Sequence, residues 1–235
     1  MPLAIFYFQL HQPFRLHPDR DEFLWDEMNR EVFEKVSEKN YLPATKMFTE
    51  LIADNPDFKI TLSMSGTFLE QAQDYKPEVI SSLQDLLAAG RDRDQVEFLE
   101  ETYYHSLAGL FGDWRMLEFR EQVYLHAVKM DEIFGVRPTS FRNTELMYNN
   151  DIAHAVANME YKSILCEKRD DMYGLKDGRL VSPNAVFKAK DSSLIVIPRN
   201  RELSDDVAYR FPHTPVLAED YASNIAKIDG EAVLL

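Results

Sequence analysis

The stretch LAIFYFQLHQP, residues 3–13, joins a β-rich apolar run to an abrupt polar ending. Runs of aromatic and aliphatic residues are typical of a buried strand, so we predict a strand over residues 3–10. The run ends on His11 and Gln12, directly before Pro13. Proline restricts the residue before it to extended backbone, so we expect Gln12 to be fixed and His11 to be held with it. His11 is then either a ligand-binding group at the end of the strand or a core histidine with its hydrogen bonds satisfied.

Short β-rich runs recur along the chain, and stretches with helical spacing separate most of them. The predicted strands cover residues 3–10, 58–65, 95–100, 139–145, 162–167, 193–199 and 231–235. The predicted helices cover residues 22–54 with a break at Pro43, 67–89 continuing through Pro77, 115–134, 149–160 and 215–228. Alternating strands and helices imply right-handed crossovers and a mostly parallel sheet, open or closed into a barrel. We therefore predict an α/β protein.

Composition limits the class of protein further. The chain has 235 residues, 45% of them hydrophobic, which is enough for one core, and we expect a single domain over residues 1–235. The formal net charge of −14 argues against nucleic acid or an anionic membrane as the partner, although it also serves solubility. A lone cysteine, Cys166, excludes an internal disulfide. With no signal peptide and no apolar run long enough for a membrane span, we expect a cytoplasmic protein.

Polar residues follow several of the predicted strands. In parallel α/β sheets, ligand sites lie beyond the carboxyl ends of the strands. The residues at these ends are His11 with Gln12, Ser65, Glu100 with His105, Arg142 to Glu145, Glu167, and Arg199 with Arg201. Together they predict a site lined by carboxylates, imidazoles and guanidinium groups.

The stretch SFRNTELMYNN, residues 140–150, is polar where a buried strand should be apolar. If Glu145 ends this strand, Arg142 or Asn143 can hold its carboxylate ionised and oriented, because a neighbouring cation favours the charged form. A fixed, ionised carboxylate is what a glycosidase nucleophile requires. The alternative is a helix cap at Asn143 or Thr144, with Glu145 in the first turn of the helix.

The stretch QVEFLEETYYHSLAGLF, residues 95–111, gathers ionisable and aromatic residues near one predicted strand end. They are Glu97, Glu100, Glu101, His105, Tyr103 and Tyr104. Carboxylates and imidazoles bind sugar hydroxyls, and aromatic rings stack on the apolar faces of sugars. The alternative is a solvated acidic turn above a tyrosine-rich core. We expect at least one exposed aromatic platform among Phe14, Tyr103, Tyr104 and Tyr148.

Metal, nucleotide and thiol chemistry are not expected. The sequence contains none of the motifs HxxxH, HExxH, CxxC, GxGxxG or the Walker-type phosphate loop. Asp151 and His154 share a helix face, but we interpret them as a solvated pair. We therefore predict no metal and no cofactor.

Taken together, these stretches resemble glycoside hydrolase family 57, in its α-amylase and 4-α-glucanotransferase-like members. The resemblance rests on FQLHQP, on residues 95–111, on FRNTELMYNN and on LSDDVAYRF (residues 203–211). It implies an incomplete seven-stranded β/α barrel and retaining action on α-glucans or maltooligosaccharides without a metal. It implies that Glu145 is the nucleophile. The substrate-binding residues would be His11, Gln12, Glu97, His105, Arg142 and Tyr104.

One departure from the family pattern concerns the acid/base, which in the family is an aspartate just beyond a strand that follows a helix. Here that strand corresponds to residues 231–235, where the sequence stops. We therefore expect a fragment of the barrel, truncated at its C-terminus, that holds the nucleophile without its partner. Such a fragment would hydrolyse ordinary glucans very slowly, because general acid–base assistance contributes about 10²–10⁴-fold.

Two other functions remain open from the sequence. One is a catalytically inactive carbohydrate-binding or regulatory module on the same barrel. The other is a deacetylase- or mannosidase-like metal enzyme on a related barrel. The sequence does not choose among hydrolysis, transglycosylation and branching, and it does not fix the oligomeric state.

Overall fold

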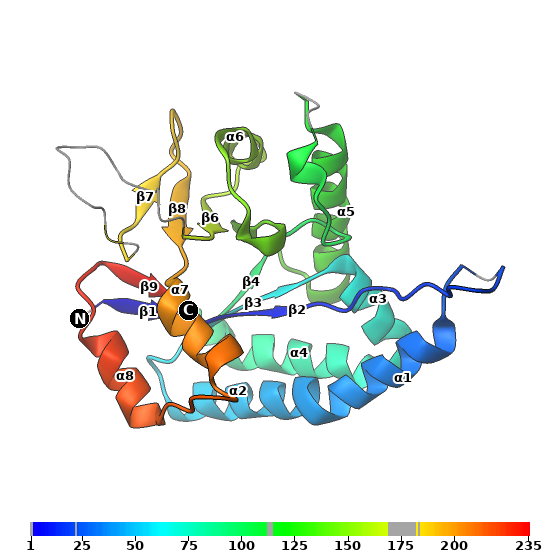
Figure 1. The fold of residues 1–235 in the computed structure, drawn as a ribbon, viewed down its shortest axis with the longest axis horizontal. Coiled ribbons are helices and arrows are strands. Elements are labelled where there is room, and N and C mark those ends of the chain that lie inside the picture. The colour runs from blue at the N-terminus through cyan, green and yellow to red at the C-terminus, as the bar shows by residue number, and fades with distance from the viewer. Residues whose placement is uncertain (1, 22, 112–114, 169–181, 183) are drawn as a thin grey trace. The chain divides into compact units, whose positions relative to one another are not determined.

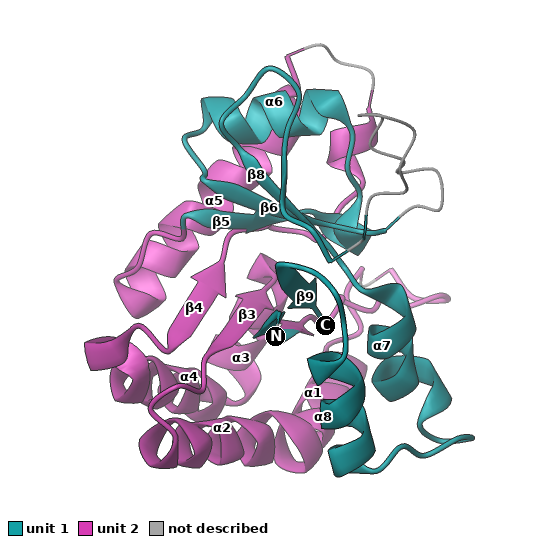
Figure 2. Cartoon of the chain, turned by 90° about the vertical axis from the view of Figure 1, so that its left-hand side faces the viewer, with its two compact units in different colours: residues 1–7, 139–235 teal, residues 8–138 magenta. Residues whose placement is uncertain are grey.

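The computed structural model describes residues 2–21, 23–111, 115–168, 182 and 184–235. The chain divides into two compact units (Figure 2): unit 1 holds residues 1–7 and 139–235, and unit 2 holds residues 8–138. The two ends of the sequence therefore meet in unit 1, where β1 (Leu3–Ile5) pairs in parallel with β9 (Ala232–Leu234). The single domain expected over residues 1–235 stays a prediction.

Unit 2 is built on the sheet β2-β3-β4, with helices packed against one face (Figure 1). Its strands are β2 (Tyr7–Leu10), β3 (Ile60–Met64) and β4 (Val96–Leu99), and β3 and β4 run parallel from Ile60↔Val96 to Ser63↔Leu99. Its helices are α1 (Asp26–Val36), a π-helical turn (Ser37–Tyr41), α2 (Leu42–Asp54), α3 (Gly66–Tyr75), α4 (Pro77–Gly90) and α5 (Leu117–Phe134). Short 3₁₀ turns cover Arg91–Arg93 and Ala108–Leu110.

Unit 1 holds a second sheet in the order β5-β6-β8-β7. Strands β5 (Ser140–Arg142), β6 (Ser163–Cys166) and β8 (Ile195–Pro198) are parallel, and β7 (Phe187–Lys188) is antiparallel to β8. A single bridge between Arg199 and Leu234 links the end of β8 to β9. The helices are α6 (Asn150–Asn158), α7 (Arg201–Asp205) and α8 (Ala218–Ala226), with short turns at Thr144–Leu146 and Asp206–Arg210.

The predicted class, α/β with mostly parallel strands, is confirmed. The described part of the chain has nine strands rather than the seven predicted. The run 3–10 divides at Phe6, because its first half pairs with β9 and its second half joins the sheet of β3. The other extra strand, β7, has only two residues, too few to show a sequence pattern.

Proline explains two differences in the helices. Pro43 does not end the helical run: it lies in the first turn of α2, directly after the π-helical turn Ser37–Tyr41, and the backbone before it is already helical. Pro77 instead divides the second predicted helix, because it begins α4 just after α3 ends at Tyr75. Among the residues described, no helix has both the length and the apolarity needed to cross a membrane.

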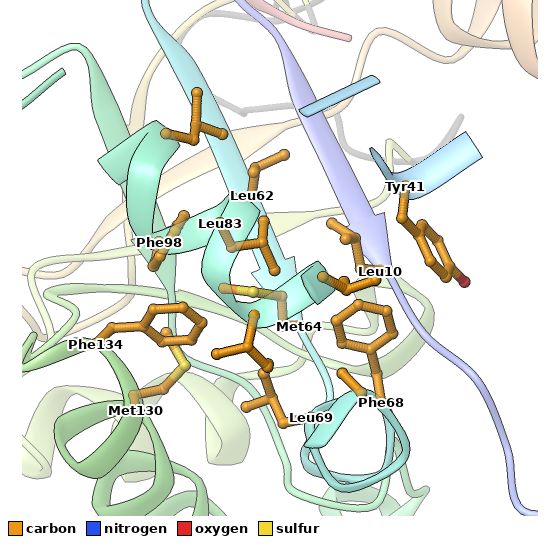
Figure 3. Packing of buried hydrophobic residues seen from close by; sticks show 14 of the residues in the cluster. Leu10, Tyr41, Leu62, Met64, Phe68, Leu69, Leu83, Phe98, Met130 and Phe134 are labelled. Carbon is orange, nitrogen blue, oxygen red and sulfur yellow. The ribbon is translucent and has the colours of Figure 1, made fainter. Parts of the chain in front are cut away.

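The core of unit 2 lies between its sheet and its helices. Leu10, Met64 and Phe98 belong to the same buried cluster as Leu83 of α4 and Phe134 of α5, and Figure 3 shows their side chains gathered together. Successive side chains of a strand point to opposite faces. The residues next to Leu10 and Met64 in the sequence therefore project toward the other face of the sheet.

Candidate active site

That second face of the unit 2 sheet is polar where its strands end. Gln9 flanks Leu10, and Ser63 and Ser65 flank Met64, so strand alternation places all three on the face away from the helical core. Glu101 follows the end of β4 and reaches the same face, where it contacts Gln9 and Ser63. Residues far apart in the sequence thus meet at the carboxyl ends of adjacent strands, close to where ligand sites of α/β sheets lie.

Hydrogen bonds fix the carboxylate of Glu101 within this face. Ser63 Oγ donates to Glu101 Oε2 at 2.7 Å, and Gln9 Nε2 lies 3.2 Å from the same oxygen. Gln9 Nε2 also lies 3.0 Å from His105 Nδ1, and that ring nitrogen is 3.8 Å from Glu101 Oε1. Glu101 is almost fully buried, with a relative exposure of 1%. The carboxylate therefore orients its neighbours.

The structure brings the two predicted histidines together. The rings of His11 and His105 are stacked, with centroids 4.3 Å apart and an interplanar angle of 28°. His11 Nδ1 is 2.7 Å from Ser65 Oγ, which also caps α3 by accepting from the Phe68 N–H at 3.2 Å. His105 has a left-handed backbone with φ of 52°, an uncommon conformation for a residue other than glycine. Both rings are held by specific partners.

Gln12 is fixed, as the following proline predicts. Its side-chain amide donates from Nε2 to the Tyr41 hydroxyl at 3.0 Å, and its Oε1 accepts from Arg15 at 3.2 Å. Its main-chain oxygen accepts from Gln71 Nε2 at 2.9 Å. Both ends of the Gln12 side chain are therefore engaged within the protein.

The segment after β4 carries the predicted aromatic platform. Tyr104 is 52% exposed, and its ring lies edge-on to that of Tyr103, with centroids 4.8 Å apart. Tyr103 is buried and donates to Glu70 at 2.7 Å. The backbone of Gly66 lies so close to the Tyr103 ring that a Cβ at position 66 would be 2.5 Å from that ring. Phe14 and Tyr148 are half-buried, so Tyr104 is the exposed ring of the four considered.

The expected position of Glu97 is wrong. Glu97 is the second residue of β4, opposite Thr61, whereas Glu100 and Glu101 follow the end of this strand. The intervening residues place its Cα roughly 10 Å before that of Glu100, since a strand rises about 3.3 Å per residue. Glu97 is exposed, while Glu100 and Glu101 are buried. A role for Glu97 in binding sugar stays a prediction.

Unit 1 presents Glu145 on a strained turn directly after β5. Arg142, Asn143 and Thr144 are buried, but Glu145 is exposed. Glu145 and Leu146 both have left-handed backbones, with φ of 52° and 54°. Such conformations cost about 1–3 kcal/mol each and persist where the surroundings enforce them. The turn projects one carboxylate outward from a buried, polar strand end.

The helix-cap interpretation of this stretch holds in position only: Asn143 precedes a short 3₁₀ turn, Thr144–Leu146, that contains Glu145. Helix α6 begins only at Asn150, and its cap is Asn149, whose side chain accepts from the Ile152 N–H at 2.8 Å. Asn143 makes no side-chain cap and instead donates from Nδ2 to the carbonyl of Met147 at 3.1 Å. Its side chain therefore braces the turn that carries Glu145.

A salt-bridge group supports the same turn from β6 and β8. The Glu167 N–H donates to the carbonyl of Leu146 at 2.9 Å. The Glu167 carboxylate accepts two hydrogen bonds from Arg199, at 2.8 and 3.3 Å, and Arg199 also lies 3.4 Å from Asp205.

Beside Glu167, burial raises the pKa of the Cys166 thiol to about 12, so this cysteine is an inert part of the core.

A buried ion pair in unit 2 was missed by the sequence analysis. His126 of α5 and Glu100 have exposures of 0% and 1%, and His126 Nδ1 makes a very short contact with Glu100 Oε1. His126 Nε2 lies 2.6 Å from the carbonyl oxygen of Met64. Burial opposes the charged imidazole, but Glu100, Glu101 and the Met64 carbonyl together raise the pKa of His126 above its usual 6.5. No sequence motif predicts this pair, because His126 and Glu100 lie on separate elements.

The raised pKa of His126 predicts a pH dependence of stability. A group with a raised folded-state pKa contributes stability below its unfolded pKa, about 6.5, and loses it as pH rises through the folded value. The free energy of unfolding should therefore fall from pH 6.5 upward in the parent protein, and less steeply in His126→Gln. Urea unfolding at several pH values measures both slopes. Equal slopes in the two proteins would contradict the assignment, and His213→Gln, at an exposed position, serves as the control.

Among the residues that the structure describes, no three His, Cys, Asp or Glu side chains gather as a metal ion would need. Asp151 and His154 lie on α6, and the His154 ring is 3.2 Å from the carbonyl oxygen of Lys190. The ionisable groups described at the two strand ends are mainly carboxylates and imidazoles. In unit 2, Glu101 and His105 contact each other after the end of β4. In unit 1, the exposed side chain of Glu145 follows β5.

Comparisons with known proteins show what this chain is similar to. The family model for glycosyl hydrolase family 57 matches residues 5–235. A protein of Methanocaldococcus jannaschii, described as "Putative alpha-amylase", is 36% identical over 98% of this chain. The chain spans 50% of that relative's length. The 4-alpha-glucanotransferase of Thermococcus litoralis has a similar fold, with a TM-score of 0.69 over 100% of this chain and 33% of its own, at 15% identity. A family 57 branching enzyme of Thermococcus kodakaraensis gives 0.65 over 89% of this chain and 50% of its own, also at 15% identity.

Proposed function

This chain belongs to glycosyl hydrolase family 57, and from that premise we propose that it acts on α-glucans by a retaining mechanism. Glu145 is the nucleophile in this proposal, and His11 and His105 bind sugar hydroxyls. The relatives support the substrate class, since their names describe an alpha-amylase, a 4-alpha-glucanotransferase and a branching enzyme. Whether water or a second sugar accepts the glycosyl group is left open.

The observation that carries the proposal is the turn at Glu145. Buried polar residues precede it, a left-handed backbone turns its carboxylate outward, and hydrogen bonds from Asn143 and Glu167 fix the turn. A nucleophile must be held in one geometry and still reach the substrate. A braced turn, left-handed at Glu145 and Leu146, that leaves the Glu145 side chain exposed is consistent with both requirements.

The chemistry follows in two displacements. The Glu145 carboxylate attacks the anomeric carbon, the glycosidic C–O bond breaks, and the departing oxygen takes a proton from an acid. Water or a sugar hydroxyl then attacks the same carbon from the opposite side, gives up its proton and releases Glu145, so configuration is retained overall. The proposal assigns the nucleophile and leaves the acid unassigned.

The surroundings of the other predicted residues indicate two kinds of role, contact with the sugar and support of the site. His11 and His105 present imidazoles that accept or donate to hydroxyls, and Tyr104 offers an exposed ring for stacking. Gln12 and Arg142 are engaged or buried within the protein, so we assign them to shaping the site around the substrate. Each assignment rests on the surroundings of the side chain and on the family.

The test of this function is the stereochemistry of an activated substrate. An α-glucosyl fluoride needs little protonation of its leaving group, so it reports on the nucleophile directly. Proton NMR should show the α-anomer of glucose as the first product. A β-anomer appearing first would contradict the retaining mechanism. Tight binding of maltoheptaose without any fluoride release would favour a binding module without turnover.

Replacing His11 with alanine tests the proposed sugar-binding role. Loss of one hydrogen bond to a sugar hydroxyl should weaken maltoheptaose binding about three- to tenfold, as measured by titration calorimetry. His213→Ala, at an exposed position of unit 1, is the matched control and should bind as the parent does. Equal affinities for the parent and His11→Ala would remove His11 from the site.

A further inference from the structure

We infer that His126 is a positioning residue that sets the geometry of the stacked His11–His105 pair from the opposite face of the unit 2 sheet. The inference rests on the proposed function, because it gives these two histidines their role. His126 itself lies on α5, fully buried, and its contacts are with Glu100 and Met64. It therefore acts through other residues and touches no substrate.

The imidazole of His126 connects two strand ends. Its Nε2 lies 2.6 Å from the carbonyl oxygen of Met64, the last residue of β3. Its Nδ1 pairs with the carboxylate of Glu100, the residue directly after β4. Because both ring nitrogens are used, any shift of either strand end relative to α5 breaks a contact.

The residue that follows each of these two contact points interacts with one of the two histidines. Ser65 follows Met64, and its hydroxyl is 2.7 Å from His11 Nδ1. Glu101 follows Glu100, and its carboxylate lies 3.8 Å from His105 Nδ1. Alternation along a strand turns consecutive side chains to opposite faces, so holding one residue fixes the direction of the next.

The pair His126–Glu100 is charged although it lies in a buried core. A buried ion pair costs desolvation, and well-packed apolar residues in its place are often as stable or more so. The same helix supplies Val123 and Met130 to the core as fully buried apolar side chains. Stability alone therefore does not explain His126. Setting the relative position of two strand ends, by directional contacts to each, does explain it.

The experiment compares His126→Gln with a control of similar structural cost. Glutamine is polar, but it does not reproduce a ring that reaches both Met64 and Glu100. Met130→Ala makes a cavity in the core from the same helix and leaves both polar contacts of His126 in place, so it reports what lost stability alone does. The chain has six histidines, few enough to assign each ring in long-range proton–nitrogen spectra. Maltoheptaose affinity and the melting temperature complete the readouts.

Even if both variants lose the same melting temperature, their ring signals and their maltoheptaose affinities should differ. His126→Gln should shift the ring signals of both His11 and His105 and weaken maltoheptaose binding about fivefold or more. Met130→Ala should leave the ring signals in place and the affinity within about twofold of the parent. Unchanged signals in His126→Gln, or the same shifts in Met130→Ala, would overturn the inference.

A second variant tests the positioning role of His126 if His126→Gln does not fold. Glu100→Gln removes the charge but keeps a side chain of similar shape, and it loosens only the β4 end. It should shift the ring signals of His105 more than those of His11, and equal or reversed shifts would overturn the inference. If the parent protein binds no maltoheptaose, the proposed function fails, while the ring signals still decide the role of His126.

Discussion

Replacing Glu145 with glutamine should lower the rate of fluoride release from an α-glucosyl fluoride by at least about 10³-fold. The amide is nearly the same size as the carboxylate, but it carries no charge and does not form the glycosyl ester. Since Glu145 is exposed and only its chemistry changes, the melting temperature should stay close to that of the parent. A fluoride electrode measures the rate, and calorimetry measures the melting temperature.

Glu160→Gln is the matched control for this change. Glu160 is also an exposed glutamate of unit 1 with a left-handed backbone, with φ of 68°, and it lies outside the proposed site. It should release fluoride at the parent rate. Glu145→Ala with added azide provides a second check, because a small anion in the space left by the carboxylate should restore turnover and give the inverted glycosyl azide. Parent-like activity in Glu145→Gln would remove Glu145 from the chemistry.

Replacing Phe33 with alanine should lower the free energy of unfolding by about 3–5 kcal/mol. Phe33 of α1 is fully buried, and its ring lies 5.8 Å from Tyr41, 5.5 Å from Phe68 and 6.3 Å from Tyr75, measured between centroids. Its removal leaves a cavity among rings from the π-helical turn and α3, and the loss is large compared with the 5–15 kcal/mol stability of typical proteins. Urea unfolding monitored by circular dichroism measures the change.

Phe23→Ala makes the same chemical change at a position that is 73% exposed. Its effect should stay within about 0.5 kcal/mol, because little apolar surface is returned to water there. A loss of less than about 1 kcal/mol in Phe33→Ala would mean that the cluster collapses onto the vacated space and that the aromatic packing is not specific.

The sequence predicted the elements well where a single pattern governed them. The β-rich runs at residues 58–65 and 95–100 became β3 and β4, since their apolar residues face the core of unit 2. The run at residues 3–10 was divided because its halves pair in different sheets, a choice made by distant strands. Helix α7 was missed because five residues are too few for helical periodicity.

The candidate site was predictable only in part for a similar reason. His11 and His105 stood out as polar residues at strand ends, and they do stack on each other. Glu97 was grouped with the residues of the strand end although it lies inside the run predicted as a strand, residues 95–100. His126 looked like any residue of an amphipathic helix, and its partners on β3 and β4 come together only in the folded chain. Sequence spacing reports local periodicity, whereas these contacts depend on tertiary packing.

The central claim, that Glu145 forms the covalent intermediate, is tested most directly by trapping that intermediate. The protein is incubated with an activated α-glucosyl fluoride that carries an extra ring fluorine, which slows the second displacement more than the first. After digestion, peptide mass spectrometry locates the sugar. The account predicts one glycosyl group per chain, on the peptide that contains Glu145 and on that side chain. A label on another carboxylate, such as Glu167, or turnover of the fluoride by an enzyme that never carries a label, would contradict it.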